Sequence, residues 1–324
     1  MIDLHIHLDG SLTAKELLVL AQREGIRLPA DTPEGLRPFL TVPPGCGSLN
    51  DYLRCFETPL AVLQSPQAVE YAAASLAGRL KAQGLLYAEI RFAPQLHLKS
   101  GHRQETIVEA AIRGLQHSGL SGQLILCCMR GADEAANRDT VRTARAFLGH
   151  GVAALDLAGA EGLYPTRDYL PLFARARREG IPFTIHAGEA AGPDSVWAAL
   201  EAGAARIGHG VWAIEDPTLT AELARRGIPL EMCPTSNFQT GAAAPGGYPL
   251  KAYLEQGVPV TLNTDNTTVS GTTLSGEYAL ARERLGITAA DERTLLENAA
   301  RAAFLPESEK AALLARMRER ISFL

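Results

Sequence analysis

Residues 169–189, with the sequence YLPLFARARREGIPFTIHAGE, carry the pattern that decides the fold. Apolar residues recur at helical spacing over 169–179, and Gly180 then supplies the residue type that commonly ends a helix. A short apolar run over 183–186 follows, as in a buried strand, and ends on polar side chains. The same order of helical stretch, glycine and apolar run recurs over 218–232. A chain that alternates in this way is expected to form parallel strands joined by helices.

Eight apolar runs of strand length occur along the chain, with amphipathic stretches of helical period between them. The runs cover 2–8, 85–92, 124–129, 152–157, 183–186, 206–209, 229–232 and 260–263. The helical stretches include 69–83, 105–117, 169–179, 195–202 and 218–226. This alternation predicts an α/β fold of the (β/α)8 or TIM-barrel type, in a single domain over 1–324. An open, doubly wound sheet is the alternative architecture for the same alternation.

Two regions depart from a minimal repeat of strand and helix. About 75 residues separate the first two runs, and the segment 29–47 within them is rich in proline and glycine. An amphipathic helical pattern over 49–56 follows that segment. We therefore expect an inserted lid over the barrel mouth, at about 10–84. After the last run, helical patterns at 291–304 and 307–320 predict extra C-terminal helices.

The bulk composition limits the class of protein. Of the 324 residues, 46% are hydrophobic and 21% charged, as in an ordinary soluble globular protein. A formal net charge of -5 gives no basic footprint for nucleic acid or for an anionic membrane. No apolar stretch approaches the roughly 18 residues that a membrane-spanning helix needs. The five cysteines include no CxxC pair, which favours a reducing compartment, and we expect a cytoplasmic protein.

Histidines and a carboxylate occupy positions that a barrel brings to one end. His5 and His7 lie two residues apart in the first run, so both imidazoles point to one face of a strand. His186 and His209 end the fifth and sixth runs, and Asp265 follows the eighth. Barrel active sites are built at the carboxyl ends of the strands, so these residues are expected to converge. The alternative is a set of unrelated polar residues that line the barrel.

The chemistry of these side chains suggests their roles. His209 and Glu189 are available in the same ring as a general base and a general acid. The pattern H-x-E with P-C-x-x-C, which marks zinc deaminases of the cytidine and tRNA type, is absent. Cys233 has no partner nearby in sequence and is expected to be a packed small residue. Three nitrogens and one carboxylate, which suit one Zn²⁺ better than Mg²⁺ or Ca²⁺, are offered by His5, His7, His186 and Asp265.

Six motifs extend this site along the sequence. In chain order they are HIHLDGS at 5–11, DLAG at 156–159, TIHAGE at 184–189, RIGHG at 206–210, CPTSN at 233–237 and NTD at 263–265. Together they resemble the motifs of the adenosine deaminase family, which belongs to the amidohydrolase superfamily. The resemblance covers nearly the whole chain, from residue 2 to about 305.

The resemblance implies a reaction and the residues that perform it. The reaction is hydrolytic deamination of adenosine, and of 2′-deoxyadenosine, to an inosine-type product and ammonia. Glu189 would protonate purine N1, and His209 would help to deprotonate the attacking water and hold it in line. One Zn²⁺ per chain, which lowers the pKa of its water toward neutrality, would be bound by His5, His7, His186 and Asp265.

The same resemblance implies contacts to the substrate. The backbone N–H of Gly159 would meet purine N3, and glycine lets the backbone approach the ring closely. Asp9 would accept hydrogen bonds from a ribose hydroxyl. An apolar lid that keeps bulk water out would be formed by Leu49, Tyr52 and Phe56.

The chain departs from the family pattern at two positions. Many family members carry two acids after the threonine of the NTD motif, whereas this chain has Asn266 as the second residue. An aspartate there can donate to purine N7 only when protonated, but an asparagine amide donates at any pH. Asn266 is therefore expected to bind N7. Ala160 also stands where an acid is common, and this sequence assigns it no role.

Several related activities share the same metal and acid. The alternatives are deamination of adenine, of an N6-modified purine or of a larger adenine nucleoside such as 6-aminodeoxyfutalosine. Asp9 in the HLDG run favours a ribose and hence a nucleoside. Glu189 argues against an amide or ester hydrolase, because deamination needs a proton delivered to a ring nitrogen. A non-catalytic binding protein would be expected to have lost a ligand or the acid. The expected partner is a small purine nucleoside, with neither nucleic acid nor membrane, and the sequence leaves the oligomeric state open.

Overall fold

The strands that the sequence predicts are present in the computed structural model, which describes residues 1–321. Residues 322–324, the end of the domain predicted over 1–324, lie outside the described part. Within it, eight strands match the expected runs, with ends that differ by at most two residues. They are β1 (Ile2–His7), β2 (Tyr87–Phe92), β3 (Gly122–Met129), β4 (Val152–Ala158), β5 (Thr184–Ala187), β6 (Arg206–His209), β7 (Leu230–Met232) and β8 (Val260–Leu262).

The strands form a closed, parallel ring. Two four-stranded sheets have the orders β1-β2-β3-β4 and β5-β6-β7-β8, and every neighbouring pair in them is parallel. Isolated bridges join the sheets at both seams, between Leu155 and Phe183 and between Ile6 and Asp265. At the second seam the His7 N–H donates to the Asp265 carbonyl at 2.7 Å. These bridges close the barrel and exclude the open, doubly wound alternative.

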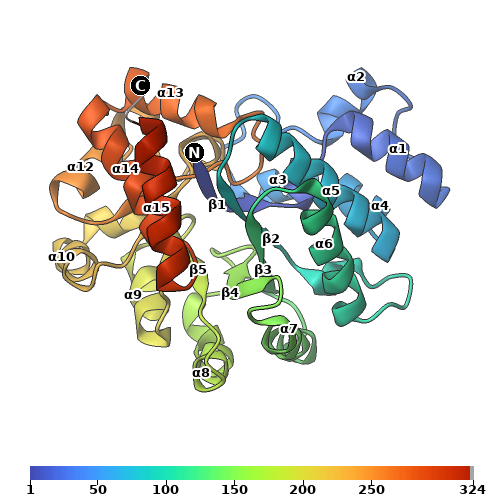
Figure 1. Cartoon of the computed structure of the whole chain (residues 1–324), viewed down its shortest axis with the longest axis horizontal. Coiled ribbons are helices and arrows are strands. Elements are labelled where there is room, and N and C mark those ends of the chain that lie inside the picture. The colour runs from blue at the N-terminus through green and yellow to red at the C-terminus, as the bar shows by residue number, and fades with distance from the viewer. Residues whose placement is uncertain (322–324) are drawn as a thin grey trace.

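Helices surround this ring in Figure 1. One follows each strand in turn, as a (β/α)8 barrel requires. They are α5 (Pro66–Ala82), α6 (Gln104–Ser118), α7 (Glu134–Phe147), α8 (Leu170–Arg178), α9 (Pro193–Ala202), α10 (Pro217–Arg226), α12 (Leu250–Glu255) and α14 (Ala289–Ala302). Two further helices lie in the loops after β7 and β8, namely α11 (Pro234–Gln239) and α13 (Leu274–Arg284). The chain continues beyond the barrel as α15 (Glu307–Ile321), which packs on α14.

Local sequence explains where these elements begin and end. Strands β2 and β4 are buried along their whole length, so most of their residues are apolar, and only Glu89, Arg91 and Asp156 interrupt the two runs. Gly180 and Gly227, which follow α8 and α10, have φ values of 71° and 64°. This left-handed conformation ends a helix at little cost only in glycine, so both glycines act as the expected stop signals.

The insertion after β1 contains two different parts. Its first part holds the helices α1 (Ala14–Glu24), α2 (Pro33–Leu36), α3 (Leu49–Leu53) and α4 (Glu57–Val62), with a 3-10 turn at Arg54–Phe56 between the last two. The second part is α5, the barrel helix that packs against α6. The expected lid at 10–84 therefore includes one ordinary barrel helix at its end.

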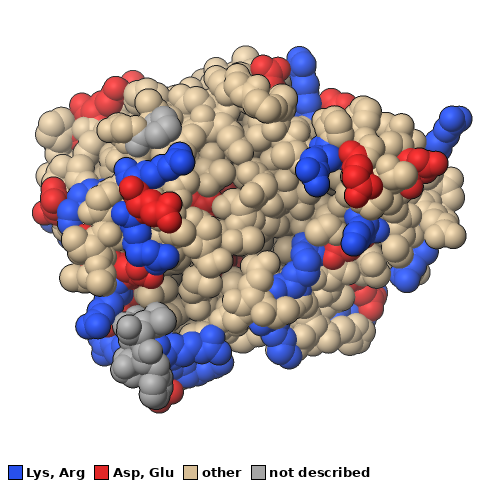
Figure 2. Space-filling model, turned by 90° about the horizontal axis from the view of Figure 1, so that it is seen from above, with Lys and Arg blue, Asp and Glu red and all other residues tan. Residues whose placement is uncertain are grey.

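The outer surface carries mixed charge. On the face shown in Figure 2, basic and acidic side chains are interspersed, and a broad uncharged area lies between them. None of the helices in residues 1–321 combines the length and apolar character that crossing a bilayer needs.

Candidate active site

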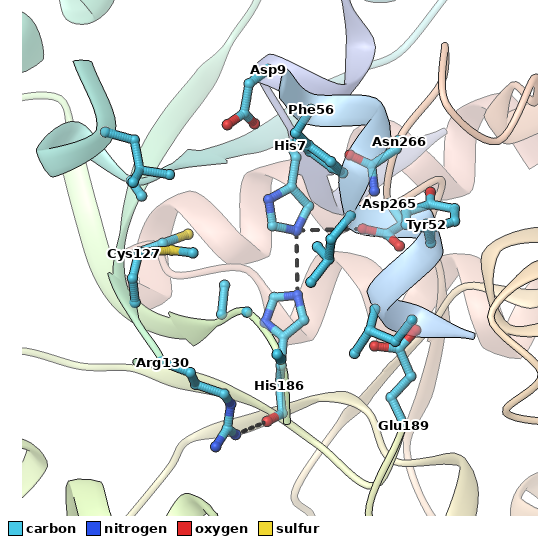
Figure 3. Close-up of a pocket in the computed structure, with 18 of the residues that line it drawn as sticks. His7, Asp9, Tyr52, Phe56, Cys127, Arg130, His186, Glu189, Asp265 and Asn266 are labelled. Atoms are coloured by element: carbon cyan, nitrogen blue, oxygen red, sulfur yellow. Dashed lines mark hydrogen bonds and ion pairs between the residues drawn. The ribbon is translucent and has the colours of Figure 1, made fainter. Parts of the chain in front are cut away.

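A cavity of about 310 Å³ opens at the carboxyl ends of the strands, beneath the inserted helix α3. Every site residue that the sequence predicts lines this cavity except His5, which lies fully buried beside it. Figure 3 shows His7, His186, Glu189 and Asp265 pointing into the same space. The structure thus brings together side chains from β1, β5 and the β8 loop that are far apart in sequence.

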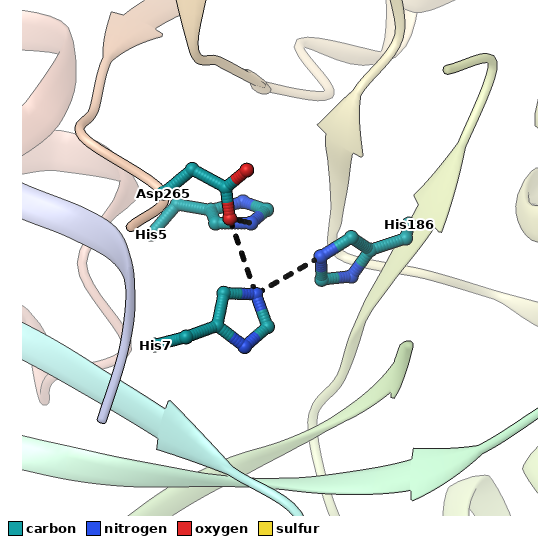
Figure 4. A group of neighbouring side chains, drawn as sticks. All are labelled: His5, His7, His186 and Asp265. Carbon is teal, nitrogen blue, oxygen red and sulfur yellow. Dashed lines mark hydrogen bonds and ion pairs between the residues drawn. The ribbon is translucent and has the colours of Figure 1, made fainter. Parts of the chain in front are cut away.

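Four of these residues form a compact group, called the metal-ligand group below (Figure 4). Each of His5, His7, His186 and Asp265 offers one ligand atom, and these atoms all lie within 4.8 Å of one another. The Nε2 atom of His7 lies 3.3 Å from Nε2 of His186 and 3.4 Å from Oδ1 of Asp265. Two ligand atoms at 2.0–2.1 Å from a tetrahedral zinc ion lie about 3.3–3.4 Å apart. The spacing of these atoms therefore suits a single zinc ion.

Carboxylates behind the histidines orient the rings for metal binding. Glu231 lies 2.8 Å from Nδ1 of His5, and Asp156 lies 2.9 Å from Nδ1 of His186. Each carboxylate accepts a hydrogen bond from the Nδ1–H group, so Nε2 keeps its lone pair and faces the other three residues. The Nε2 atom of His5 is buried and has no hydrogen-bond partner among the described residues. An orphaned nitrogen with a fixed tautomer is what a metal ligand requires.

Burial keeps His5 neutral, as a ligand must be. Desolvation, assisted by the positive charge of Arg91, lowers the pKa of His5 to about 4. The guanidinium of Arg91 bonds Asp156 and Glu231 at 2.9 and 2.8 Å, and all three side chains are fully buried. Arg91 therefore holds the two carboxylates that hydrogen-bond His5 and His186.

Glu189 faces the metal-ligand group from the loop after β5. Burial raises the pKa of Glu189 above the ordinary carboxyl range, although His209 opposes the shift. Its Oε1 accepts from the Asn237 amide at 3.3 Å and from the Thr240 hydroxyl at 3.2 Å, while Nε2 of His209 lies 3.6 Å from Oε2. Asn237 also donates to Nδ1 of His209 at 3.0 Å. Burial thus shifts Glu189 toward its protonated form, as suits a general acid.

Two of the site residues have backbones in the left-handed region. His209 and Asp265 have φ values of 64° and 58°, which residues other than glycine rarely adopt. Such conformations concentrate at functional sites, where surrounding structure compels them. Gly208 allows the histidines to pack closely, since a Cβ there would lie 3.2 Å from Cε1 of His5 and 3.1 Å from Cα of His186.

The apolar side of the cavity comes from the insertion. Tyr52 on α3 is 2% exposed, and its hydroxyl lies 2.6 Å from the Ser270 hydroxyl in the loop after β8. Phe56 meets His7 edge to face, with ring centroids 6.4 Å apart. The Val42 N–H donates to the Val269 carbonyl at 3.0 Å. The insertion thus contacts the loop after β8 next to the cavity.

The residues expected to contact substrate occupy the rim and the walls. Asp9 is 5% exposed, and its Oδ1 has no hydrogen-bond partner among the described residues. Asn266 is 2% exposed, and its amide nitrogen faces the cavity in Figure 3. Gly10 makes room for Asn266, since a Cβ there would lie 1.8 Å from the amide oxygen. Gly159 also lines the cavity, and its φ of 108° is a conformation that residues with a side chain rarely adopt.

Sequence reasoning missed some residues of this site. Cys127, Met129 and Arg130, at and just after the end of β3, also line the cavity. The predicted strand at 124–129 could have suggested them, because every strand of a barrel contributes its carboxyl end. Cys233 is buried, and burial raises the pKa of its thiol well above the ordinary value. It packs inside the barrel as expected for a small residue.

The chain matches a known protein family over almost its whole length. The model of the family described as "Adenosine deaminase" matches residues 1–320. An adenosine deaminase from Haemophilus ducreyi is 49% identical over 331 residues, which cover 99% of this chain and 96% of that protein. This chain belongs to the adenosine deaminase family. It is accordingly a metal-dependent hydrolase of the amidohydrolase superfamily, and the resemblance seen in the sequence is confirmed.

Solved structures of deaminases share the fold of this family member. Adenine deaminase from Arthrobacter aurescens superposes with a TM-score of 0.90 at 28% identity, covering 99% of this chain and 98% of that chain. The N6-mAMP deaminase of Arabidopsis superposes with a TM-score of 0.87 at 25% identity, covering 98% of this chain and 97% of that one. The TIM-barrel prediction is therefore confirmed by fold comparison as well as by the strand bridges.

Proposed function

We propose that this protein catalyses the hydrolytic deamination of adenosine and 2′-deoxyadenosine to the inosine products and ammonia, with one zinc ion per chain. The observation that carries the proposal is the position of Glu189. Its buried carboxyl group faces the three-histidine, one-aspartate group across a largely apolar cavity of about 310 Å³. A cavity of that size suits a small ligand such as a nucleoside.

The residues present fit zinc as the metal. Imidazole nitrogens and a carboxylate oxygen are among the ligands that Zn²⁺ takes in proteins, and the separations of His7 from His186 and from Asp265 match those of two ligands on one tetrahedral ion. Ser236 donates to Oδ2 of Asp265 at 2.6 Å, which leaves Oδ1 free to face the histidines. A zinc ion held there supplies Lewis-acid chemistry that activates water near neutral pH.

Glu189 supplies the proton that makes the purine reactive. Protonation of N1 withdraws electron density from C6, where water adds. This lowers the barrier that the aromaticity of the ring opposes to nucleophilic attack. The raised pKa of Glu189 keeps a proton available for this step. His209, whose Nε2 lies 3.6 Å from Oε2 of Glu189, holds the attacking water in line and assists its deprotonation. The lid residue Phe56 packs above His7 and excludes bulk water.

Three further residues orient the nucleoside. We assign the Gly159 N–H to N3, the Asn266 amide to N7 and the Asp9 carboxylate to a ribose hydroxyl. Asp9 supports this role because a buried carboxylate oxygen without a partner is costly unless a ligand satisfies it. Asn266 supports the role at N7 because its amide donates without needing to be protonated first.

The same pocket disfavours a nucleotide. Arg130 is the one arginine or lysine among the described residues that line the cavity. Its guanidinium is already bound to the Tyr164 carbonyl, the Thr166 hydroxyl and the His186 carbonyl, at 2.7, 2.9 and 2.7 Å. A 5′-phosphate would therefore meet Asp9 without a free cation to balance it. All five cysteines are unpaired, which supports our placement of the protein in the cytoplasm.

The assay for this proposal follows ultraviolet absorbance during incubation with zinc-loaded protein. The substrates are adenosine, 2′-deoxyadenosine, adenine, AMP and N6-methyl-AMP at equal concentrations. Adenosine and deoxyadenosine should give the highest kcat/KM. Faster turnover of adenine or of either nucleotide would contradict the nucleoside assignment and favour one of the sibling activities.

A further inference from the structure

Glu161, in the loop after β4, has an unusual set of hydrogen bonds. Its side chain is 2% exposed, and its carboxylate accepts bonds from four consecutive backbone N–H groups in the loop after β5. The donors, with N···O distances of 2.7, 3.0, 2.6 and 3.1 Å, are Gly188, Glu189, Ala190 and Ala191. The hydroxyl of Ser195 adds a fifth donor.

Such a set of donors requires an ionised carboxylate. Oε1 accepts from Gly188 and Ser195, and Oε2 accepts from the other three N–H groups. A carboxylate has two oxygens with about four lone-pair sites and no proton to donate, so these five donors occupy its whole accepting capacity and some share a lone pair. Successive backbone N–H groups form a concavity that binds anions, and here the anion is a side chain of the same protein. Bonds to a charged acceptor are stronger than neutral ones. The conformation of residues 188–191 therefore depends on the charge of Glu161.

The position of Glu161 connects two groups that act on the same edge of the substrate. Glu161 lies two residues beyond Gly159, and it bonds the backbone N–H of Glu189 itself. Purine N1 and N3, which we assign to Glu189 and Gly159, are separated by one ring atom. We propose that Glu161 is a positioning residue that fixes the Glu189 loop against the Gly159 loop and thereby aligns proton donation to N1. This inference rests on the proposed function.

Further buried hydrogen bonds connect the loop after β4 with the loop after β5. The Ser195 hydroxyl lies 2.7 Å from the Thr166 hydroxyl, and Arg130 bonds both the Thr166 hydroxyl and the His186 carbonyl. The loop that carries Glu189 is thus anchored at its start through Arg130 and along its length through Glu161.

The substitution Glu161→Gln tests the inference, because it keeps the shape of the side chain while removing its charge. Glutamine has one acceptor oxygen, and its NH₂ group would face N–H donors. We expect kcat for adenosine to fall roughly 10- to 100-fold, the cost of a displaced catalytic group, with KM and bound zinc little changed. If Glu161 acts through Glu189, the loss should disappear when Glu161→Gln is made in a Glu189→Gln background. Losses that simply multiply in the double variant would overturn the inference.

A second readout does not depend on activity. Hydrogen exchange of the amides at 188–191, measured on the protein without substrate, should be faster in Glu161→Gln than in the wild type. Unchanged protection there would contradict the inference even if the enzyme were slower. If the wild type does not deaminate adenosine, the proposed function fails, and the exchange measurement still decides whether Glu161 holds this loop.

Glu277→Gln is the matched control. Glu277 on α13 is also a buried glutamate, 1% exposed, but it accepts from Thr235 and Thr272 and makes no hydrogen bond to residues 188–191 among the described contacts. This variant should keep kcat close to the wild-type value and leave the exchange of 188–191 unchanged. Loss of both readouts in the control as well would show that any buried glutamate has the same effect, and would overturn the specific role of Glu161.

Discussion

Replacement of Asn266 by alanine tests how the purine is recognised at N7. Asn266 is 2% exposed, and its amide nitrogen faces the cavity next to the metal-ligand group (Figure 3). Alanine removes the amide without adding bulk, and Gly10 already leaves the adjoining space empty of side chain. The change should therefore remove one hydrogen bond to the substrate and leave the barrel intact.

The size of the loss follows from the burial of the pair. A buried polar atom left without its partner costs about 1–3 kcal/mol, and 1.4 kcal/mol corresponds to a tenfold change. The kcat/KM of Asn266→Ala for adenosine should accordingly fall roughly 5- to 150-fold. Bound zinc and the thermal midpoint should stay near the wild-type values, because Asn266 makes no side-chain contact to the four ligands among the described hydrogen bonds.

The assay compares adenosine with 7-deazaadenosine, in which a carbon replaces N7. The wild type should use the 7-deaza compound poorly, by a factor similar to that of the mutation. Asn266→Ala should then show little further loss on the 7-deaza compound, because the contact is already absent. Equal use of both substrates by the wild type, or equal losses on both in the variant, would remove Asn266 from N7 recognition.

Three other changes give separate tests of the site. Glu189→Gln should keep the zinc and the fold while lowering kcat by a factor on the order of 10² or more. Because burial raises the pKa of Glu189, wild-type kcat/KM should fall as pH rises through that pKa. A pH profile that is the same in the variant would exclude Glu189 as the donor. Asp9→Ala should lower kcat/KM for adenosine roughly 10- to 100-fold but barely affect adenine, and equal losses on both substrates would leave Asp9 only a structural role. His5→Ala should abolish turnover together with zinc binding, whereas a variant that keeps metal and activity would exclude His5 as a ligand.

The sequence predicts the barrel because the strands are buried on both faces. Such strands, β2 and β4 among them, appear as largely apolar runs, and glycines such as Gly180 mark the helix ends before the next strand. The metal ligands can be predicted for a related reason. Strand periodicity places His5 and His7 on one face, and barrel geometry brings the ends of other strands to them.

The supporting residues cannot be predicted in this way, because their contacts are purely tertiary. Glu231 is 226 positions from His5 in sequence, and no local pattern pairs a carboxylate in β7 with a histidine in β1. Glu161 lies two residues after the DLAG motif, but its role depends on the backbone conformation of a different loop. Arg91 is an arginine inside a largely apolar strand. Its role can be recognised only from the structure, where it bonds Asp156 and Glu231.

A zinc titration of the metal-free protein tests the central claim most directly. The protein is stripped with a chelator, zinc is added in known amounts, and bound metal and adenosine deamination are measured on the same samples. We predict that deamination rises in proportion to bound zinc and reaches its maximum at one ion per chain. Full adenosine deaminase activity in protein without bound metal, or zinc-loaded protein that leaves adenosine unchanged, would contradict this account.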